Sequence, residues 1–350
     1  MDAATDRNHI DAMIKTAPFS WTRRSALGLT LGGLSMLALR PALANWPDVV
    51  DERWMFHDPA SAVVIDHEDW TQFLRRFLQI DDNGVALVRY DEISDQDRGN
   101  LWDYIARLSS LDFPALNRNE QLAAWINLYN AATVEVILQN YPVDSIRDIT
   151  DGLLSFGPWG MDVVTVDGQA LSLDDIEHGI LRPIWQDPRI HFVVNCASIG
   201  CPNLGHSAYE GRDIDERMDR ATHVYINNRR GADLDLQGRL VVSGLFDWYD
   251  DDFGRNEEEI IDYIRSYAVE PLTGLVDGAT EIEDYRYDWA LNDASGMARP
   301  DARHKGSESY TPEAQAEAQQ ALEEVATDAD STGGRRGSDT IKADDFLDMN

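Results

Sequence analysis

The chain has 350 residues, of which 43% are hydrophobic and 9% aromatic, so it can bury a core and does not resemble collagenous, disulfide-stapled or polytopic membrane proteins. It carries 63 acidic residues against 30 basic ones, a formal net charge of −33, and no Lys/Arg stripe, which argues against nucleic acid or an anionic membrane surface as a partner. Only 3 residues are Lys, and this acid-rich, lysine-poor composition indicates adaptation to high salt, where charge repulsion is screened. An ordinary acidic protein is the alternative.

An export signal is predicted at the amino terminus. The pair Arg23-Arg24 precedes a mostly apolar run, Ala26–Leu39, which is followed by the small-residue sequence Ala42-Leu43-Ala44. The paired arginines resemble a twin-arginine signal, which exports folded proteins. An uncleaved anchor is the alternative, but the run is shorter than the ~20 residues that a membrane span needs. We expect residues 1–44 to be a cleaved export signal, so that the protein acts in the periplasm or outside the cell without a membrane span.

The rest of the chain divides by composition. Apolar periodicity continues to Asn292 and then gives way to Ala, Gln, Glu, Ser, Thr and Gly. We expect residues 45–292 to form a single globular domain. Residues 293–350 are expected to be an acidic low-complexity tail with too little apolar surface to order itself.

Hydrophobic periodicity predicts six helices, at residues 68–78, 96–108, 120–139, 173–182, 214–227 and 257–267. Strands are predicted at 163–166 and 169–171 around the turn pair Asp167-Gly168, at 190–196, at 234–236 with 240–242, and at 281–287. Hairpins and helices that do not alternate strictly predict an α+β fold, with several helices packed on a small, mainly antiparallel sheet. No dinucleotide, Walker, HExxH or GxSxG motif is present.

Two asparagines interrupt an otherwise apolar helix. Residues 123–132 are apolar on nearly every side, which is typical of a central buried helix. Asn127 and Asn130 share one face of it, and a buried amide left unpaired would cost ~1–3 kcal/mol. These amides either anchor a loop through its backbone or line a polar pocket, and the sequence leaves both alternatives open.

A carboxylate and a histidine are adjacent on the predicted helix 173–182. Glu177 falls within its apolar face, and His178 falls about 100° away, toward the polar boundary. A buried carboxylate either pairs with a cation, which is the commoner outcome, or has a raised pKa suited to proton transfer. His178 by itself would be an ordinary boundary histidine.

The predicted strand 190–196 ends at the first of the two cysteines in the chain. It would place His191 and Asn195 on one face and Cys196 on the other, and Cys196 would enter a loop of small and turn-forming residues. A thiol at the end of a strand can act as a nucleophile beside backbone N–H donors that stabilise an oxyanion.

The two cysteines allow other interpretations. In an exported protein, Cys196 and Cys201 could close a small loop as a structural disulfide, although twin-arginine export folds the chain in a reducing compartment first. A buried, inert thiol is a further alternative. His191, Cys196, Cys201 and His206 also supply a two-Cys, two-His set for zinc, but their spacing matches no familiar zinc-finger pattern. We therefore predict neither a metal nor a cofactor.

Five blocks of the chain, in order, resemble the family known as domain of unknown function 547. The matching blocks are residues 124–131, 171–182, 191–196 with 201–202, 243–249 with 252–254, and 287–292. The resemblance covers about 110–292 and implies no established reaction. Members of the family usually have Gly where this chain has Ala197, and forming an oxyanion turn is one role such a Gly could serve.

These observations support two hypotheses of different class. The first is a thiol-dependent hydrolase or acyl transferase, with Cys196 as nucleophile, His178 or His191 as its base, and Glu177 orienting that base. The candidate substrate-pocket residues are Asn127, Asn130 and Asn195. The second is a non-enzymatic binding or scaffold module with a Cys196–Cys201 disulfide. We expect a small-molecule or peptide-like ligand of undetermined identity, and the sequence does not determine the oligomeric state.

Overall fold

In the computed structural model, which describes residues 49–150 and 157–296, one long buried helix organises the first part of the fold. This helix, α3 (Arg118–Asn140), begins at Asn117, whose side chain accepts hydrogen bonds from the backbone N–H groups of Asn119 and Glu120. Every residue from Glu120 to Ile137 is buried. This stretch is therefore a helix that is covered on all sides, as its apolar composition predicts.

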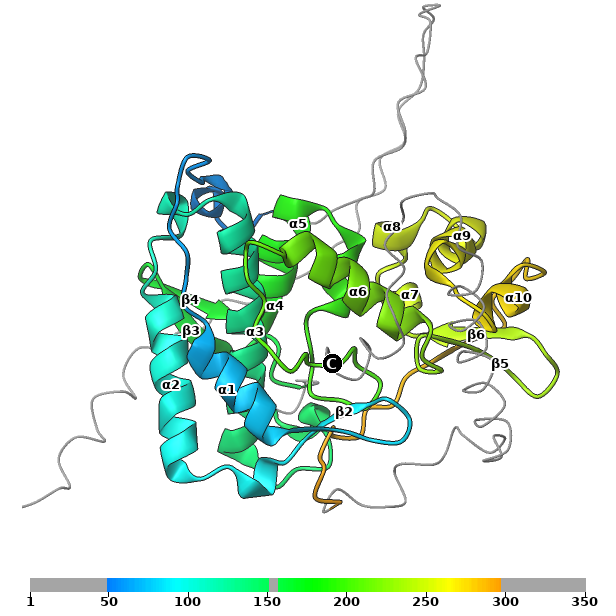
Figure 1. Cartoon of the computed structure of the whole chain (residues 1–350), viewed down its shortest axis with the longest axis horizontal. Helices are drawn as coiled ribbons and strands as arrows, with labels where there is room; N and C mark the ends of the chain where they lie inside the picture. Colours follow the sequence, from blue (N-terminus) through cyan, green and yellow to red (C-terminus); the bar gives the residue numbers. More distant parts are fainter. Residues whose placement is uncertain (1–48, 151–156, 297–350) are drawn as a thin grey trace, which may run out of the picture. The chain divides into compact units, whose positions relative to one another are not determined.

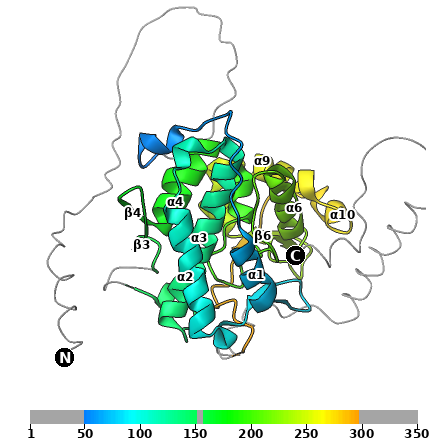
Figure 2. The same cartoon turned by 60° about the vertical axis from the view of Figure 1, so that its left-hand side comes forward.

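Two helices and two hairpins surround α3. Helix α1 (Glu68–Phe77) packs on α2 (Asp95–Ser109), and α2 packs on α3. Figures 1 and 2 show α2 and α3 side by side, with α1 next to them. Strands β1 (Leu78–Ile80) and β2 (Ala86–Val88) form one antiparallel hairpin. Strands β3 (Asp162–Val166) and β4 (Gln169–Ser172) form another, with the predicted turn at Asp167-Gly168 in its left-handed conformation.

A second group of elements has its own apolar core. Helix α6 (Ile214–Ile226) contacts both α3 and α9 (Glu257–Tyr267). The remaining elements of this group are β5 (Ala232–Leu234), β6 (Leu240–Ser243), α7 (Leu245–Trp248), α8 (Asp250–Phe253), α10 (Leu272–Val276) and β7 (Asp284–Arg286). Strand β6 pairs with β5 in antiparallel and with β7 in parallel orientation. The α+β prediction is thus confirmed, with the strands distributed over three small sheets in the described residues.

The predicted strand at residues 190–196 is wrong. Pro188–Phe192 is a short 3-10 helix, preceded by Asp187, whose side chain accepts a hydrogen bond from the N–H of Arg189. Ile190 is buried in the core around α3, whereas Phe192 is buried in the second core. The segment is apolar because it crosses between two cores, and periodicity cannot distinguish that situation from a buried strand.

The predicted helix at 173–182 is present but changes its pitch. Helix α4 (Leu173–Ile176) continues into a π-helical turn, Glu177–Leu181, and then into α5 (Arg182–Trp185). Pro183 has no N–H to donate to the carbonyl of Gly179, and that carbonyl accepts a hydrogen bond from the N–H of Val50 instead, at 2.8 Å. The π turn contains Glu177 and His178, and such turns are frequent at functional sites.

The described residues extend past the predicted domain boundary at Asn292. Asp293 is buried, with its carboxylate 3.1 Å from the hydroxyl of Tyr141, and the N–H of Ala294 donates to the carbonyl of Val88. The predicted export signal and the tail from residue 297 lie outside the described residues. Among the described helices, none combines the length and the apolar character that crossing a membrane requires.

These contacts predict that residues 293 and 294 stabilise the fold. A chain that stops at Gly296 keeps both contacts and is the reference for the comparison. A chain that stops at Asn292 loses the bonds to Tyr141 and Val88, worth about 1 kcal/mol each, and should melt a few degrees lower. Differential scanning calorimetry of both chains measures this difference. Equal melting temperatures would keep the domain boundary at 292.

Candidate functional site

A cavity of about 280 Å³ lies between the two groups of elements. Its walls include α3, the π turn, the loop that follows the 3-10 helix, α7 and the segment after β7. Four residues that the sequence singled out line this cavity: Glu177, His178, His191 and Cys196. Cys201 lines it as well, so both sulfur atoms and both candidate base histidines border the same space.

Both cysteines are free thiols, with their sulfur atoms 2.8 Å apart. The Sγ of Cys201 accepts a hydrogen bond from the backbone N–H of Cys196 at 2.9 Å. The hydroxyl of Tyr287 lies 3.0 Å from the Sγ of Cys196 and accepts a hydrogen bond from Ser198, which leaves the tyrosine proton free to be donated to the sulfur. Cys196 is thus surrounded by hydrogen-bond donors.

These donors separate the two thiols electrostatically. Burial alone would raise the pKa of Cys196, but the hydrogen-bonding contacts of its sulfur with Cys201, Ser198 and Tyr287 outweigh burial and lower that pKa below its usual value. Burial raises the pKa of Cys201 well above its usual value. Cys196 is therefore the member of the pair that ionises first, and a thiolate is the nucleophilic form of cysteine.

Buried amides fix the loop that carries Cys196. The side chain of Asn130 donates to the carbonyl of Val193 at 2.9 Å and accepts from the N–H of Asn195 at 2.8 Å. Asn195 in turn bonds the N–H of Ala197 and the carbonyl of Pro202. The amide groups of Asn130 and Asn195 are thus hydrogen-bonded to the backbone of this loop. For Asn130, this arrangement corresponds to the alternative in which the amide anchors a loop.

Asn127 anchors a second loop in the same way. Its amide donates to the carbonyl of Tyr209 at 2.8 Å and accepts from the N–H of Tyr209 at 3.0 Å. Asn127, Asn130 and Asn195 are all buried and none of them borders the cavity that contains Cys196.

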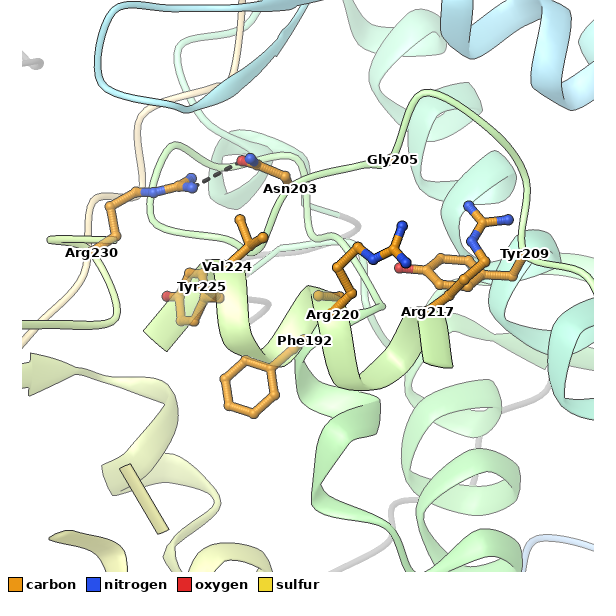
Figure 3. Close-up of a pocket in the computed structure, with 10 residues that line it drawn as sticks. Phe192, Asn203, Gly205, Tyr209, Arg217, Arg220, Val224, Tyr225 and Arg230 are labelled. Carbon is orange, nitrogen blue, oxygen red and sulfur yellow. Dashed lines mark hydrogen bonds between the residues drawn. The ribbon is translucent and has the colours of Figure 1, made fainter. Parts of the chain in front are cut away.

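A half-buried arginine holds the other side of the cysteine loop. Arg230 donates to the carbonyls of Ile199 and Cys201, at 2.9 and 2.8 Å, and to the side chain of Asn203 at 2.9 Å. Figure 3 shows Arg230 reaching Asn203 at one end of a separate cavity of about 50 Å³, with Arg217 at the other end. Burial lowers the pKa of Arg230. Nothing in the local sequence distinguished this residue from the other arginines.

A histidine lies between two carboxylates next to the cysteine loop. The Nε2 of His191 is 2.6 Å from the carboxylate of Asp252, and its Nδ1 is 3.6 Å from that of Glu177. Tyr249 stacks on the ring of His191 with 4.0 Å between the ring centroids. Asp252 also accepts two hydrogen bonds from Arg182, at 2.6 and 2.9 Å. The side chain of His191 is thereby fixed by contacts on its edge and its face.

His178 is held differently. Its Nδ1 accepts a hydrogen bond from Arg182 at 3.2 Å and lies 4.0 Å from Glu177, while its Nε2 lies 3.8 Å from Asp174. The side chain of His178 is 31% exposed, whereas that of His191 is completely buried.

The carboxylate of Glu177 lies between two histidines, 3.6 Å from the Nδ1 of His191 and 4.0 Å from the Nδ1 of His178. Burial would raise its pKa, but the nearby His178 and His191 and a hydrogen bond from Tyr129 lower that pKa to about 2. Glu177 is therefore an anion at neutral pH, not a proton donor.

The cavity brings the predicted residues together without a direct bond between cysteine and histidine. The hydrogen-bond partners of the Cys196 sulfur are Ser198, Cys201 and Tyr287. Across the described ranges, no group of three or more His, Cys, Asp or Glu side chains is arranged to hold a metal ion, so the zinc set considered from the sequence does not assemble there.

Several residues of the site were not identified from the sequence as site residues. Tyr287 and Trp289 follow β7, Asp252 belongs to α8, and Trp248 belongs to α7. The blocks that resemble the family contain all four, and that was the available signal. Asp252 and Tyr287 act on His191 and Cys196, which are 61 and 91 residues away in sequence, and local patterns do not encode such contacts.

Comparison with known proteins supports the resemblance. Residues 113–226 match the sequence profile of the family described as "Protein of unknown function, DUF547". No curated protein and no solved structure matches the chain. The matched range contains Glu177, His178, His191 and both cysteines, while Asp252 and Tyr287 lie beyond it.

The backbone at Ala197 generates a prediction about stability. Ala197 has φ 59°, a left-handed conformation that costs a residue with a Cβ about 1–2 kcal/mol. This explains why a Gly would be usual at this position. Ala197→Gly should therefore change stability little, because relief of this strain is offset by the larger entropy loss of Gly and by the loss of a buried methyl group worth about 0.8 kcal/mol.

Urea unfolding measures this change, and Ala106→Gly is the control. Ala106 is exposed within α2, where Gly should destabilise the fold by about 1 kcal/mol. A destabilisation by Ala197→Gly as large as that by Ala106→Gly, or larger, would contradict the strain assigned to Ala197.

The low pKa of Glu177 predicts how stability depends on pH. Because this pKa falls from about 4.5 to about 2 on folding, Glu177 stabilises the fold above pH 4.5, and the effect is lost as the pH falls through 2. Glu177→Gln should cost roughly 3 kcal/mol at pH 7, and its difference from wild type should shrink as the pH falls from 4.5 toward 2. Urea unfolding at pH 7 and pH 3 measures both effects.

Glu258→Gln provides the matched control, because Glu258 is exposed on α9 and its loss should change stability by less than about 0.5 kcal/mol. A constant difference between wild type and Glu177→Gln across this pH range would show that the charge of Glu177 is not what stabilises the fold.

Proposed function

We propose that the protein is a thiol-dependent hydrolase or acyl transferase in which Cys196 is the nucleophile. The observation that carries this proposal is the environment of its sulfur, which borders a cavity, lies 3.0 Å from the hydroxyl of Tyr287 and has a lowered pKa. A thiolate stabilised by fixed donors beside a space for substrate meets the first requirement of nucleophilic catalysis.

His191 is better suited than His178 to serve as the base. Asp252 accepts from the Nε2 of His191 at 2.6 Å, and the Nδ1 has no hydrogen-bond partner. The Nδ1 of His178 already accepts a hydrogen bond from Arg182. A carboxylate that orients a histidine on its far nitrogen is the arrangement of a nucleophile, base and orienting group. Glu177, at 3.6 Å, would stabilise the imidazolium formed when His191 takes up a proton.

The proposed reaction has two stages. His191 takes the thiol proton, the sulfur of Cys196 attacks the substrate carbonyl carbon, and a C–S bond replaces the bond to the leaving amine or alcohol, which receives that proton. Water, or another nucleophile in a transfer reaction, then attacks the thioester and gives its proton to His191. The acid or transferred acyl product leaves, and the Cys196 thiol re-forms as His191 returns the proton.

A minimal ester tests this assignment. With p-nitrophenyl acetate, the protein should release up to one equivalent of nitrophenolate rapidly and carry an acetyl group on Cys196, detected by peptide mass spectrometry. Cys196→Ala should abolish the adduct at that position, and Asp252→Asn should slow its formation at least tenfold. His178→Ala is the matched histidine control and should retain the burst. Acetylation of Cys196 at an equal rate in wild type and Asp252→Asn would remove the proposed orienting role.

The closeness of the sulfur atoms supports a second candidate, a binding or scaffold module in which Cys196 and Cys201 form a structural disulfide. Intact mass before and after alkylation distinguishes the two candidates. The enzyme requires a free thiol at Cys196 in the native protein, whereas the scaffold predicts that neither cysteine is alkylated until reductant is added. Purification from the exported fraction keeps the native redox state.

We further propose that the protein is exported through the twin-arginine route and acts in a salty periplasmic or extracellular medium. The support is the sequence of residues 1–44 and the net charge of −33. The exported protein should begin at Asn45, and replacing Arg23 and Arg24 with Lys should leave it in the cytoplasm. Amino-terminal sequencing and fractionation test both expectations. Unimpaired export of the Lys-Lys variant would exclude this route.

A further inference from the structure

The cavity beside Cys196 has an aromatic wall. Trp159, Trp248, Tyr287 and Trp289 line it and contact one another. The rings of Trp248 and Trp289 stack with centroids 5.3 Å apart, and Tyr287 lies 4.6 Å from Trp289. Trp248 is 43% exposed, which is unusual for so large an apolar side chain that already has aromatic neighbours. A face of the wall is therefore accessible to a ligand.

Carboxylates are among the residues that line the cavity. Asp174 and Glu177 line it together with His178 and His191, and no Lys or Arg is among its lining residues. The side chain of Asp174 is 51% exposed, and its charged neighbour is His178, at 3.8 Å. Two guanidinium groups lie behind the lining: Arg182 is held by Asp252 and lies over the ring of Tyr249, and Arg147 lies over the ring of Trp289. The lining itself presents a ligand with carboxylates and ring faces, and no guanidinium or ammonium group is part of it.

The same features suit a cation. Ring faces carry partial negative charge and attract an ammonium group within about 6 Å, most strongly when the ring is Trp. A carboxylate at the edge of the cavity adds a Coulombic attraction. We propose that the cavity binds an organic ammonium group, seated between the ring of Trp248 and the carboxylate of Asp174.

This proposal names a class of substrate for the thiol described above, and in that respect it rests on the proposed function. The acyl donor or acceptor carries a quaternary or primary ammonium group close to its reactive carbonyl or nucleophilic atom, because Cys196 borders the same cavity. The volume of about 280 Å³ accommodates a small head group such as choline or the end of a lysine side chain.

Isothermal titration calorimetry with choline and its uncharged isostere 3,3-dimethyl-1-butanol tests the proposal on the full chain at constant ionic strength. Choline should bind at least tenfold more tightly than the isostere. Butylammonium distinguishes the primary amine from the quaternary one, since a primary ammonium donates hydrogen bonds and should depend more on Asp174. Glucose, an uncharged polar molecule, is titrated as a further comparison. Equal binding of choline and the isostere, or tighter binding of glucose than of choline, would overturn the proposal.

Two variants with matched controls locate the site. Trp248→Ala should weaken choline binding about threefold or more, whereas Trp102→Ala, which removes an equally exposed ring from α2, should leave it unchanged. Asp174→Asn should weaken butylammonium binding, and Asp103→Asn on α2 should not. Choline affinity that is insensitive to both Trp248→Ala and Asp174→Asn would contradict this placement.

Cys196→Ala separates this proposal from the proposed function, since the variant should lose acetylation at that position but retain choline binding. Choline binding without acetylation of the wild type would refute the thiol chemistry and leave the ammonium site standing. Acetylation of Cys196 without preferential choline binding would refute the ammonium site and leave the thiol chemistry standing.

Discussion

The position of Cys196 depends on buried hydrogen bonds to the backbone of one irregular loop. Asn130 reaches the loop from α3, and Arg230 reaches it from the opposite side. Part of this backbone pairs with residues 288–292, because Ile199 and Gly200 donate to the carbonyls of Ala290 and Asp288. Side chains supply further partners, and a buried backbone group left unpaired would cost about 1–3 kcal/mol. The loop is therefore as well determined as a regular element, and it can hold a thiol at a fixed place.

The second constraint is charge compensation in a buried cluster. The carboxylates of Glu177 and Asp252 alternate with the imidazole of His191 and the guanidinium of Arg182, with contacts from 2.6 to 3.6 Å between successive groups. Removing one member would leave a neighbouring charge buried without a partner, which costs more than the pair contributes in net stability. The π turn belongs to this part of the site because it contains Glu177 and His178, and both side chains border the cavity. The helix changes its pitch at this turn, and Pro183, which has no backbone N–H, lies in the segment that follows, α5.

The arginines near the cavity bind other groups of the protein and are not among the residues that line the cavity. The protein contains 30 basic residues, and most arginines near the site are engaged with carboxylates or carbonyls in the structure described above. Arg182 belongs to the buried cluster, and Arg230 to the cysteine loop. Both therefore contribute to architecture. The side chains that line the cavity are mainly aromatic rings, thiols, histidines and carboxylates, and their chemistry limits which ligands the cavity can bind.

The sequence by itself determined the elements whose signal is local. The sequence predicted the turn at Asp167-Gly168 and, to within two residues at each end, the helices at 68–77, 95–109, 118–140, 214–226 and 257–267, because their periodicity and capping residues lie within one segment. The sequence also identified Glu177, His178, His191 and Cys196, since each interrupts an apolar framework and all now border one cavity. It did not distinguish whether Asn127 and Asn130 hold a loop or face a ligand.

Tertiary structure decided what depends on distant partners. The apolar run at 190–196 became a 3-10 helix and a loop because its side chains enter two different cores, and a sequence window contains no information on how many cores surround it. Tyr287 and Asp252 joined the site across 91 and 61 residues, respectively, from Cys196 and His191. The properties of the thiol and the histidine follow from these neighbours, because a pKa and a ring orientation are set by what surrounds a group in space, whatever its position in the chain.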